Sequence, residues 1–309
     1  MKICSVIVTY NRKKLLEECI SSIFNQSYEV SSIIIIDNCS TDGTEEKLKS
    51  SNIIGNKKVI YIKLKENIGG AGGFYTGIKE AIKDQYDWLW IMDDDTIPTK
   101  TALEELLNAS KLITEKTSFL CSKVIGPEDE EMNIPNISRR VERNGYQSWM
   151  KYLNNGIVEV SSATFVSVLI KYEAIKKVGL PWSEFFIWGD DIEYTSRLVN
   201  NYGNGYVIGR SIVIHKRHGA KNITIVEEDN INRLKFYKYK YRNDILIAKG
   251  YGGVKSYLKV IILSIRDIKN IIFYSKVYRI LKIKLLISSL LNGIFNIALN
   301  KRFKARFKS

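Results

Sequence analysis

Three consecutive carboxylates, Asp93, Asp94 and Asp95, follow the apolar run WLWIM without a spacer. Acids that emerge directly from a buried strand are costly unless a positive charge neutralises them. Side chains alternate along an extended chain, so Asp93 and Asp95 are expected to point to the same side. Two converging carboxylates suit a hard divalent cation, Mn or Mg, that keeps open positions for phosphate oxygens. A turn whose acids cap the following helix is the simpler alternative.

A second acidic pair, Asp190 and Asp191, follows the stretch FFIWG and precedes a predicted helix. When two carboxylates lie beside aromatic residues, one of them can have a raised pKa and act as a general base. Helix N-capping is the alternative role for this pair. His215 ends a predicted strand, where its imidazole could complete an oxygen-rich metal site or serve only structure.

Four glycines, Gly69, Gly70, Gly72 and Gly73, follow Asn67. They predict a turn that lets the backbone approach a nucleotide closely, with a helix N-terminus beyond it. The spacing matches neither GxGxxG nor GxxxxGK[ST], which disfavours dinucleotide binding and ATP hydrolysis. A merely flexible turn is the alternative.

Strands and helices alternate through the first hundred residues, which predicts an α/β layer with a parallel sheet. The predicted strands cover 3–9, 32–36, 59–64 and 88–92. Such sheets bind ligands at the carboxyl ends of their strands, and here those ends read TYNR, DNCSTDGT, ENIGGAGG and DDD. Later elements are predicted as helices over 102–112, 172–177 and 192–200, and as strands within 158–170 and 206–215.

The net charge of +14 is concentrated near the end of the chain. Residues 233–309 contain 19 Lys and Arg against two acids, whereas residues 1–232 contain 28 against 31. The basic segment also contains many Ile, Leu, Tyr and Phe, a mixture that is compatible with an amphipathic helical region on an anionic bilayer. A nucleic-acid surface and a solvated helical face are the alternatives.

The four cysteines form no CxxC pair, and no signal peptide precedes the first strand. This pattern is typical of a protein in the reducing cytosol. No uncharged apolar run reaches the roughly 18 residues of a spanning helix. Attachment to a membrane is therefore expected to be peripheral, on its inner face.

Six motifs occur in the order known from inverting family-2 glycosyltransferases, which the chain resembles over residues 1–220. They are VIVTYNR, IIIDNCSTDGT, ENIGGAGGF, DDD, WGDD and a strand-end His. The resemblance implies a GT-A fold over 1–230, an α/β, Rossmann-like mixed sheet flanked by helices that binds a nucleotide sugar. A basic, helical C-terminal region is expected over 231–309.

Within that family, NIGGAGGFYTG together with DDD and WGDDIEY most resembles bacterial galactofuranosyltransferases. Rhamnosyltransferases that use dTDP-rhamnose are the second resemblance, followed by other hexosyltransferases. The polymerising galactofuranosyltransferases are longer, and no counterpart of their extra N-terminal domain is expected here. A single-linkage enzyme is therefore expected.

The resemblance assigns a role to each matching residue. In the donor site, Thr9, Tyr10 and Arg12 would border the nucleotide, Asp37 would contact the uridine base or ribose, Asn67 and Gly70 would line the cavity, and Asp94 would face the donor sugar or ribose. The metal ligands would be Asp93, Asp95 and His215. Asp191 would be the catalytic base and Asp190 its acceptor-binding neighbour. The aromatic residues nearby, Trp182, Phe185, Phe186 and Trp188, predict a sugar-stacking wall or, alternatively, core packing.

These roles imply an inverting, metal-dependent transfer of galactofuranose from UDP-galactofuranose to a glycan acceptor, in bacterial surface polysaccharide synthesis. The expected acceptor is lipid-linked, and an anionic membrane surface is the expected partner of residues 233–309. Nucleic acid is not an expected partner. The competing hypothesis from another class is a non-catalytic nucleotide- or nucleic-acid-binding protein.

Overall fold

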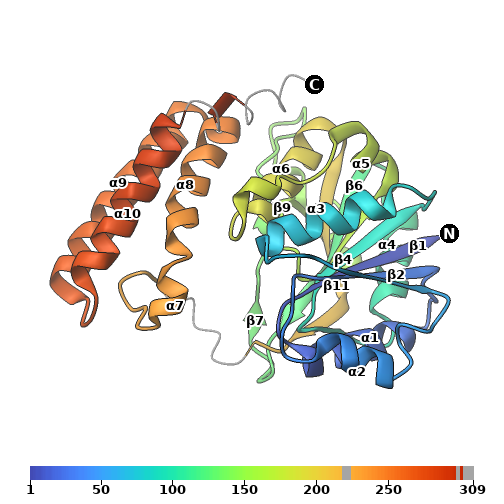
Figure 1. Cartoon of the computed structure of the whole chain (residues 1–309). Coiled ribbons are helices and arrows are strands. Elements are labelled where there is room, and N and C mark those ends of the chain that lie inside the picture. Colours follow the sequence, from blue (N-terminus) through green and yellow to red (C-terminus); the bar gives the residue numbers. More distant parts are fainter. Residues whose placement is uncertain (218–223, 297–299, 302–309) are drawn as a thin grey trace. The chain divides into compact units, whose positions relative to one another are not determined.

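The computed structural model describes residues 1–217, 224–296 and 300–301 (Figure 1). The basic residues 302–309 lie outside the described part of the chain. The chain divides into two compact units. The first contains Met1–Glu184 and Asp191–His218, and the second contains Phe185–Asp190 and Gly219–Ser309.

The first unit is an α/β unit. Its N-terminal half contains β1 (Ile3–Thr9), α1 (Lys13–Phe24), β2 (Ser32–Asp37), α2 (Thr44–Ser50), β3 (Val59–Lys63), α3 (Gly69–Ala81) and β4 (Trp88–Asp93). The other half contains β5 (Thr96–Pro98), α4 (Ala102–Leu112), β6 (Thr117–Ile125), β7 (Glu131–Met132), β8 (Asn136–Ile137), β9 (Ile157–Ser162), β10 (Val168–Lys171), α5 (Tyr172–Val178), α6 (Asp190–Asn201) and β11 (Asn204–His215). Single 3-10 turns occupy Ser148–Met150, Leu153–Asn155 and Ser183–Phe185.

Within the described residues, eleven strands form one mixed sheet. The strand order is β3-β2-β1-β4-β10-β6-β11-β9-β8, with β5 beside β11 and β7 beside β6. Strands β1 to β4 are parallel, as predicted, and β10 runs antiparallel to both β4 and β6. The predicted mixed sheet flanked by helices is confirmed.

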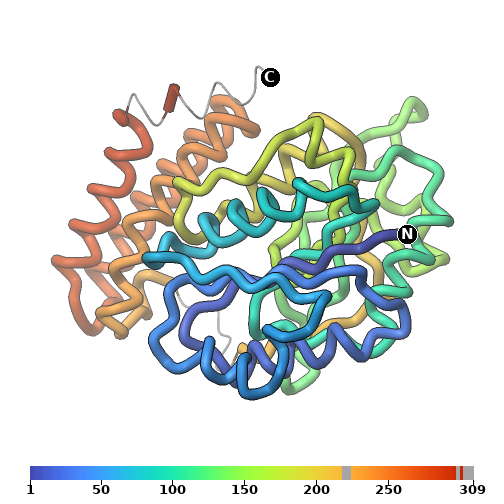
Figure 2. The backbone as a smooth tube through the Cα atoms, turned by 45° about the vertical axis from the view of Figure 1, so that its right-hand side comes forward, coloured from blue at the N-terminus to red at the C-terminus, as the bar shows by residue number. Residues whose placement is uncertain are grey.

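Both faces of the sheet are covered, which explains why β1 is buried at every position. Ile3 and Ile7 pack in one core with α1 and α4, whereas Val6 and Phe74 belong to the other core with α3, α5 and α6. This division follows from the alternation of side chains along a strand. Figures 1 and 2 show α1 and α2 on one side of the sheet and α3 on the other.

The glycine-rich segment already belongs to the helix, so its prediction as a turn that precedes the helix was wrong. Helix α3 begins at Gly69, which has a φ of +76°, and the next glycines lie in its first turns. A Cβ on Gly73 would lie 2.4 Å from Val8 Cγ1, and one on Gly77 would lie 2.4 Å from Val6 Cγ1. These two glycines therefore let α3 pack closely on β1. Gly70 differs, because nothing lies within 4 Å of its Cβ position.

The predicted strand region 158–170 divides into two strands with different neighbours. Strand β9 pairs with β11, whereas β10 inserts between β4 and β6. The chain must leave the sheet between them, which interrupts the extended run. Helix α6 begins at Asp190, two residues earlier than predicted, and thus includes both acids of the WGDD motif.

The second unit is helical. It contains α7 (Ile231–Leu234), α8 (Tyr237–Ile247), a π-helical turn (Ala248–Gly252), α9 (Gly253–Tyr274) and α10 (Arg279–Phe295). Two observations correct the predicted boundary at residue 230. Ile225 packs in the core of this unit with Leu234 and Leu286, and Phe185–Asp190 also belong to it.

Helix α8 packs tightly against α10. A Cβ on Gly293 would lie 3.0 Å from the carbonyl oxygen of Arg242, so glycine permits the approach. The hydroxyl of Ser289 donates to the Lys238 carbonyl and accepts from the Arg242 N–H. The Tyr241 hydroxyl joins α8 to Asp267 on α9. Each helix in the described part of the chain is too short or too polar to cross a bilayer.

Candidate active site

The candidate site begins where β1 and β4 end side by side. In the strand order β3-β2-β1-β4, the neighbours β2 and β4 lie on opposite sides of β1. Such a switch point in the strand order creates a crevice at the carboxyl ends of the strands. Val8 and Asp93 form the last residue pair between β1 and β4. Thr9 and the three acids therefore meet at one edge of the sheet.

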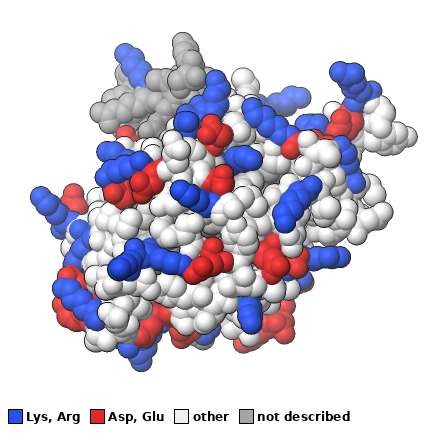
Figure 3. Space-filling view, turned by 90° about the vertical axis from the view of Figure 1, so that its right-hand side faces the viewer, with Lys and Arg blue, Asp and Glu red and all other residues white. Residues whose placement is uncertain are grey.

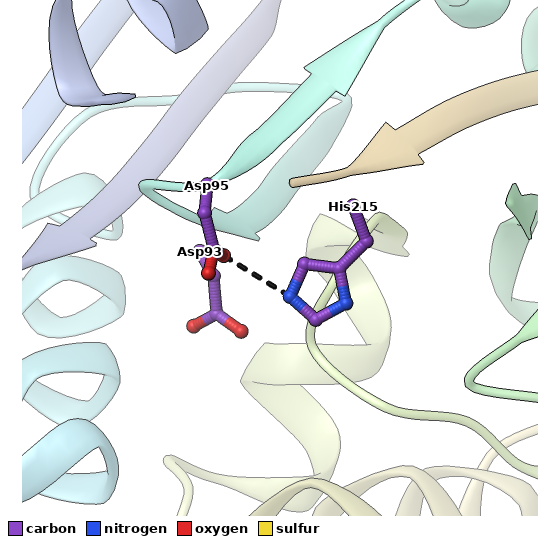
Figure 4. Close-up of side chains that lie close together, drawn as sticks. All are labelled: Asp93, Asp95 and His215. Atoms are coloured by element: carbon purple, nitrogen blue, oxygen red, sulfur yellow. Dashed lines mark hydrogen bonds and ion pairs between the residues drawn. The ribbon is translucent and has the colours of Figure 1, made fainter. Parts of the chain in front are cut away.

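Asp93, Asp95 and His215 come together at this edge, as the sequence predicted (Figure 4). Each offers a ligand atom within 4.8 Å of the others. Strand β5 follows Asp95 and pairs with β11, so that Thr96 lies opposite His215. His215 Nε2 lies 3.1 Å from Asp95 Oδ1, and His215 Nδ1 lies 2.9 Å from Asn133 Oδ1. No sequence pattern indicated Asn133, which follows the short strand β7.

The middle acid, Asp94, is buried beside an arginine and a threonine. Thr9 Oγ1 donates to Asp94 Oδ2 at 2.6 Å, and Arg12 Nη1 lies 3.3 Å from Asp94 Oδ1. The same guanidinium pairs with Asp95. Thr9 and Arg12, both predicted to border the nucleotide, thus hold the acids in this structure.

The pKa values of the two buried acids differ in direction. Burial, only partly offset by the charge of Arg12, raises the pKa of Asp94 to about 6. Burial also opposes ionisation of Asp95, but the hydrogen bond from His215 and the charges of His215 and Arg12 hold its pKa below the usual range. The cluster therefore concentrates negative charge on Asp95.

A divalent cation fits these residues. The two carboxylates and one imidazole are ligands that Mn accepts, and their atoms converge. The acids already attract Arg12 and His215, which indicates negative charge in need of compensation. The cluster is thus a candidate site for a divalent cation.

The other predicted donor residues surround the turns after β2 and β3. Asp37 is fully buried, and its oxygens accept from Ser40 N–H and the Tyr61 hydroxyl, so here it shapes the turn after β2. Asn67 accepts from Gly69 N–H, while Gly70 stands open and Tyr10 is exposed. Their contacts with a donor remain predictions.

Asn38 is a residue that the sequence reasoning missed. It is buried at the end of β2, where its side-chain oxygen accepts from Ile68 N–H at 3.0 Å. Its side-chain nitrogen donates to the Gly69 carbonyl at 2.9 Å. Asn38 therefore fixes the start of α3 beside β2. Its position inside the DNCS motif was the only available signal.

Asp190 and Asp191 occupy the first turn of α6, where the helix dipole favours negative charge. Asp190 is buried and Asp191 is partly exposed. The Asp191 carbonyl accepts from Thr195 Oγ1 at 2.7 Å, which anchors the first turn. Glu193, which follows closely, is buried in an ion pair with Arg197 and therefore belongs to the structural core.

The two tryptophans of the predicted sugar wall have different environments. Trp182 is only 1% exposed, so it presents no ring face to a sugar, and its role is corrected to core packing. Phe185 is likewise buried. Trp188 is partly exposed, with its ring edge-to-face with Tyr237 at 5.1 Å between centroids.

A single sheet with helices on both faces and an acidic cluster at its switch point defines an α/β ligand-binding fold. Residues 4–178 match the family described as Glycosyl transferase family 2. That match covers more than half of the chain, which therefore belongs to this family of glycosyltransferases.

Sequence relatives cover different shares of the chain. The chain is 23% identical to galactofuranosyltransferase GlfT1 of Mycolicibacterium smegmatis over 267 residues, which are 80% of this chain and 84% of that protein. It is 34% identical over 100 residues to poly-beta-1,6-N-acetyl-D-glucosamine synthase of Staphylococcus aureus. That stretch is 31% of this chain and 22% of the synthase.

Solved structures share the GT-A fold. GalNAc-T7, crystallised with UDP, GalNAc and Mn2+, matches with a TM-score of 0.64 at 16% identity over 97% of this chain. The match spans only 57% of the GalNAc-T7 chain. Residues 1–349 of S. aureus TarS with UDP-GlcNAc match with a TM-score of 0.54 at 16% identity, over 96% of this chain and 73% of the TarS chain. The predicted GT-A fold is confirmed.

Proposed function

We propose that this glycosyltransferase moves galactofuranose from UDP-galactofuranose to a hydroxyl of a glycan acceptor, with inversion. The observation that carries the proposal is the convergence of Asp93, Asp95 and His215 at the switch point of the sheet. The choice of sugar is supported by the similarity to galactofuranosyltransferase GlfT1 over most of both chains. Synthesis of a bacterial surface polysaccharide is the proposed setting.

In the proposed reaction, Asp191 removes the proton from the acceptor hydroxyl. The acceptor oxygen then bonds to the anomeric carbon while the bond from that carbon to the diphosphate breaks, so UDP leaves in one displacement. Asp190 binds the acceptor beside the base. Asp93, Asp95 and His215 are proposed to hold Mn or Mg, which would neutralise charge on the departing diphosphate.

A panel of nucleotide sugars tests the donor. Release of the nucleoside diphosphate, which is UDP or dTDP according to the donor, is measured for UDP-galactofuranose, dTDP-rhamnose and UDP-GlcNAc, each with Mn, with Mg and with a chelator. We expect release to be fastest with UDP-galactofuranose and to stop with the chelator. The second candidate, UDP-GlcNAc, is favoured by the similarity to the poly-beta-1,6-N-acetyl-D-glucosamine synthase and by the TarS complex. Faster release from UDP-GlcNAc would overturn the proposed donor.

We also propose that the second unit binds an anionic membrane surface, where a lipid-linked acceptor would be presented on the cytoplasmic side. Helix α9 exposes a stripe of apolar side chains at helical spacing, namely Val254, Leu258, Ile262 and Ile265. Exposed basic residues lie beside this stripe, at Lys255, Lys259, Arg266 and Lys269. Apolar insertion and basic contacts of about 1 kcal/mol each would act together.

Substitution on α9 tests this attachment without removing the helix. Ile262→Asp is compared with Ile134→Asp, because the two side chains are similarly exposed, at 65% and 75%, in different units. Co-sedimentation with phosphatidylglycerol vesicles at low salt is expected to decrease for Ile262→Asp alone. Binding of the unchanged protein is expected to fall as salt rises. Equal binding by both variants and the unchanged protein would exclude α9 as the contact.

The nucleic-acid hypothesis is the alternative use of the basic residues. On the face drawn in Figure 3, the described Lys and Arg are intermingled with Asp and Glu, whereas binding to a phosphate backbone uses a continuous track of basic residues. Salt-sensitive binding to DNA, without binding to any nucleotide sugar, would favour the alternative.

A further inference from the structure

The segment Phe185–Asp190 has an unusual backbone conformation. Phe186 and Trp188 have φ values of +65° and +63°, in the left-handed region that residues with a Cβ rarely adopt. Gly189 follows at +91°. Such conformations persist only where the surroundings enforce them, and they occur often at functional sites. The cause must therefore lie in the contacts of this segment.

The side chain of Asn243, on α8, makes those contacts. It is fully buried, and its Nδ2 lies 3.1 Å from the Phe185 carbonyl, 3.1 Å from the Ile187 carbonyl and 2.7 Å from the Trp188 carbonyl. An amide nitrogen has two hydrogens, so three acceptors share two donors. One side chain thus contacts three backbone carbonyls of the segment.

The opposite end of the same amide is also held. Asn243 Oδ1 accepts from Arg242 Nε at 3.0 Å and from Arg242 Nη2 at 2.8 Å. Arg242 Nη2 also lies 3.2 Å from the Phe185 carbonyl. The oxygen therefore faces the guanidinium and the nitrogen faces the carbonyls, which leaves one orientation of the amide that satisfies both sides.

Aromatic contacts place the segment on the same helix. Phe186 stacks on Tyr239 with centroids 4.6 Å apart and planes 15° apart. A Cβ on Gly189 would lie 3.0 Å from Ile247 Cδ1, so a larger residue there would press on α8. Helix α8 itself is braced by Ser289 of α10, as described above.

We propose that Asn243 is a positioning residue for the catalytic carboxylate. By holding Phe185, Ile187 and Trp188, it determines where the next residues begin α6, and Asp190 and Asp191 are the first two residues of that helix. This inference rests on the proposed role of Asp191 as the base. Asn243 itself acts only through the segment that precedes α6.

Two substitutions separate this role from simple space filling. Asn243→Asp keeps the shape but places an oxygen against the carbonyls, whereas Asn243→Ala removes the donors and leaves space. We expect Asn243→Asp to lower kcat by about 10- to 100-fold, because a small misplacement of a reacting group has effects of that size. The loss of kcat for Asn243→Ala is expected to be smaller. Affinity for UDP with Mn, measured by calorimetry, is expected to stay within twofold. Asp244→Asn, a change at the next position, which is partly exposed and pairs with Lys240, is the matched control.

The kinetic measurement is the release of nucleoside diphosphate when water serves as the acceptor, with the nucleotide sugar that the unchanged protein hydrolyses fastest. A second measurement does not depend on activity, namely hydrogen exchange of the amides in 185–191. Both variants are expected to exchange faster there, with β1 and β4 unchanged. Gly189→Ala disturbs the same segment from the other side, and it is expected to lower kcat without weakening UDP binding.

The outcomes distinguish this inference from the proposed function. Unchanged exchange over 185–191, or a larger loss of kcat for Ala than for Asp, would overturn the positioning role of Asn243. Equal losses of UDP affinity and kcat would do the same, because they indicate general unfolding. Asp191→Asn is measured in parallel. If it retains turnover, the assignment of the base is wrong, and the exchange experiment still decides whether Asn243 holds the segment.

Discussion

The two acidic sites of this protein are built in different ways. Asp93 and Asp95 lie where neighbouring strands end, so the backbone hydrogen bonds of the sheet place them. Asp190 and Asp191 begin a helix directly after a segment with left-handed residues, and side chains of α8 contact that segment. The first pair is thus positioned by the backbone hydrogen bonds of a sheet, whereas side-chain contacts contribute to the placement of the segment before the second pair.

The largest expected effect separates the chemistry of the two sites. Asp191→Asn removes the proposed proton acceptor and is expected to lower turnover about 10²-fold or more, while UDP binding with Mn is retained. Asp84→Asn, at an exposed acid of the same unit, is the control. Turnover within a few-fold of the unchanged protein would place the base elsewhere.

Loss of a proposed metal ligand is expected to have the reverse signature. Asp93→Ala and Asp95→Ala each remove a carboxylate of the converging group, so Mn-dependent UDP affinity is expected to fall. The loss should be at least the roughly 10- to 100-fold seen when residues that only support a ligand are changed. Calorimetry with and without Mn measures it. Unchanged Mn affinity in both variants would contradict the ligand assignment.

The buried acids also predict a pH dependence of stability in the protein without metal. The pKa of Asp94 is raised to about 6 in the folded state, so folding retains its proton and stability falls as pH rises from about 4 to about 6. The loss is up to about 3 kcal/mol. Asp95 has a lowered pKa, and its contribution is lost only below that window.

Denaturant unfolding of the unchanged protein and of Asp94→Asn between pH 4 and 7 checks this expectation. The stability of the unchanged protein relative to the variant should decline across that range. A constant difference would show that Asp94 titrates at its ordinary pKa.

The smallest expected effect concerns the helix that packs beside the first site. Gly73→Ala forces a Cβ against Val8 and is expected to destabilise the fold by about 1–3 kcal/mol. Gly70→Ala places a Cβ in open space and should be neutral or slightly stabilising. Thermal unfolding of both variants makes the comparison. Equal melting temperatures would mean that the contact with β1 relaxes without cost.

The strands of the sheet and the pair of acids at its edge could be predicted from the residues, and the resemblance to family-2 glycosyltransferases added His215 to that pair. Continuous apolar runs indicated strands buried on both faces, and alternation placed Asp93 and Asp95 on one side. His215 was predicted at a strand end, where it lies. These features depend on the period of a strand and on the edge at which parallel strands end, and both can be read locally.

Roles that depend on distant partners could be assigned only from the folded chain. The glycines after Asn67 were predicted as a nucleotide-binding turn, but two of the glycines in α3 exist to fit the helix against β1. Trp182 and Trp188 are six positions apart, yet one is in the core and the other is partly exposed. Asn243 contacts carbonyls more than fifty residues away. Such contacts depend on strand order and on helix packing. These bring together segments that are distant in the sequence, and the local pattern of one segment does not indicate its partner.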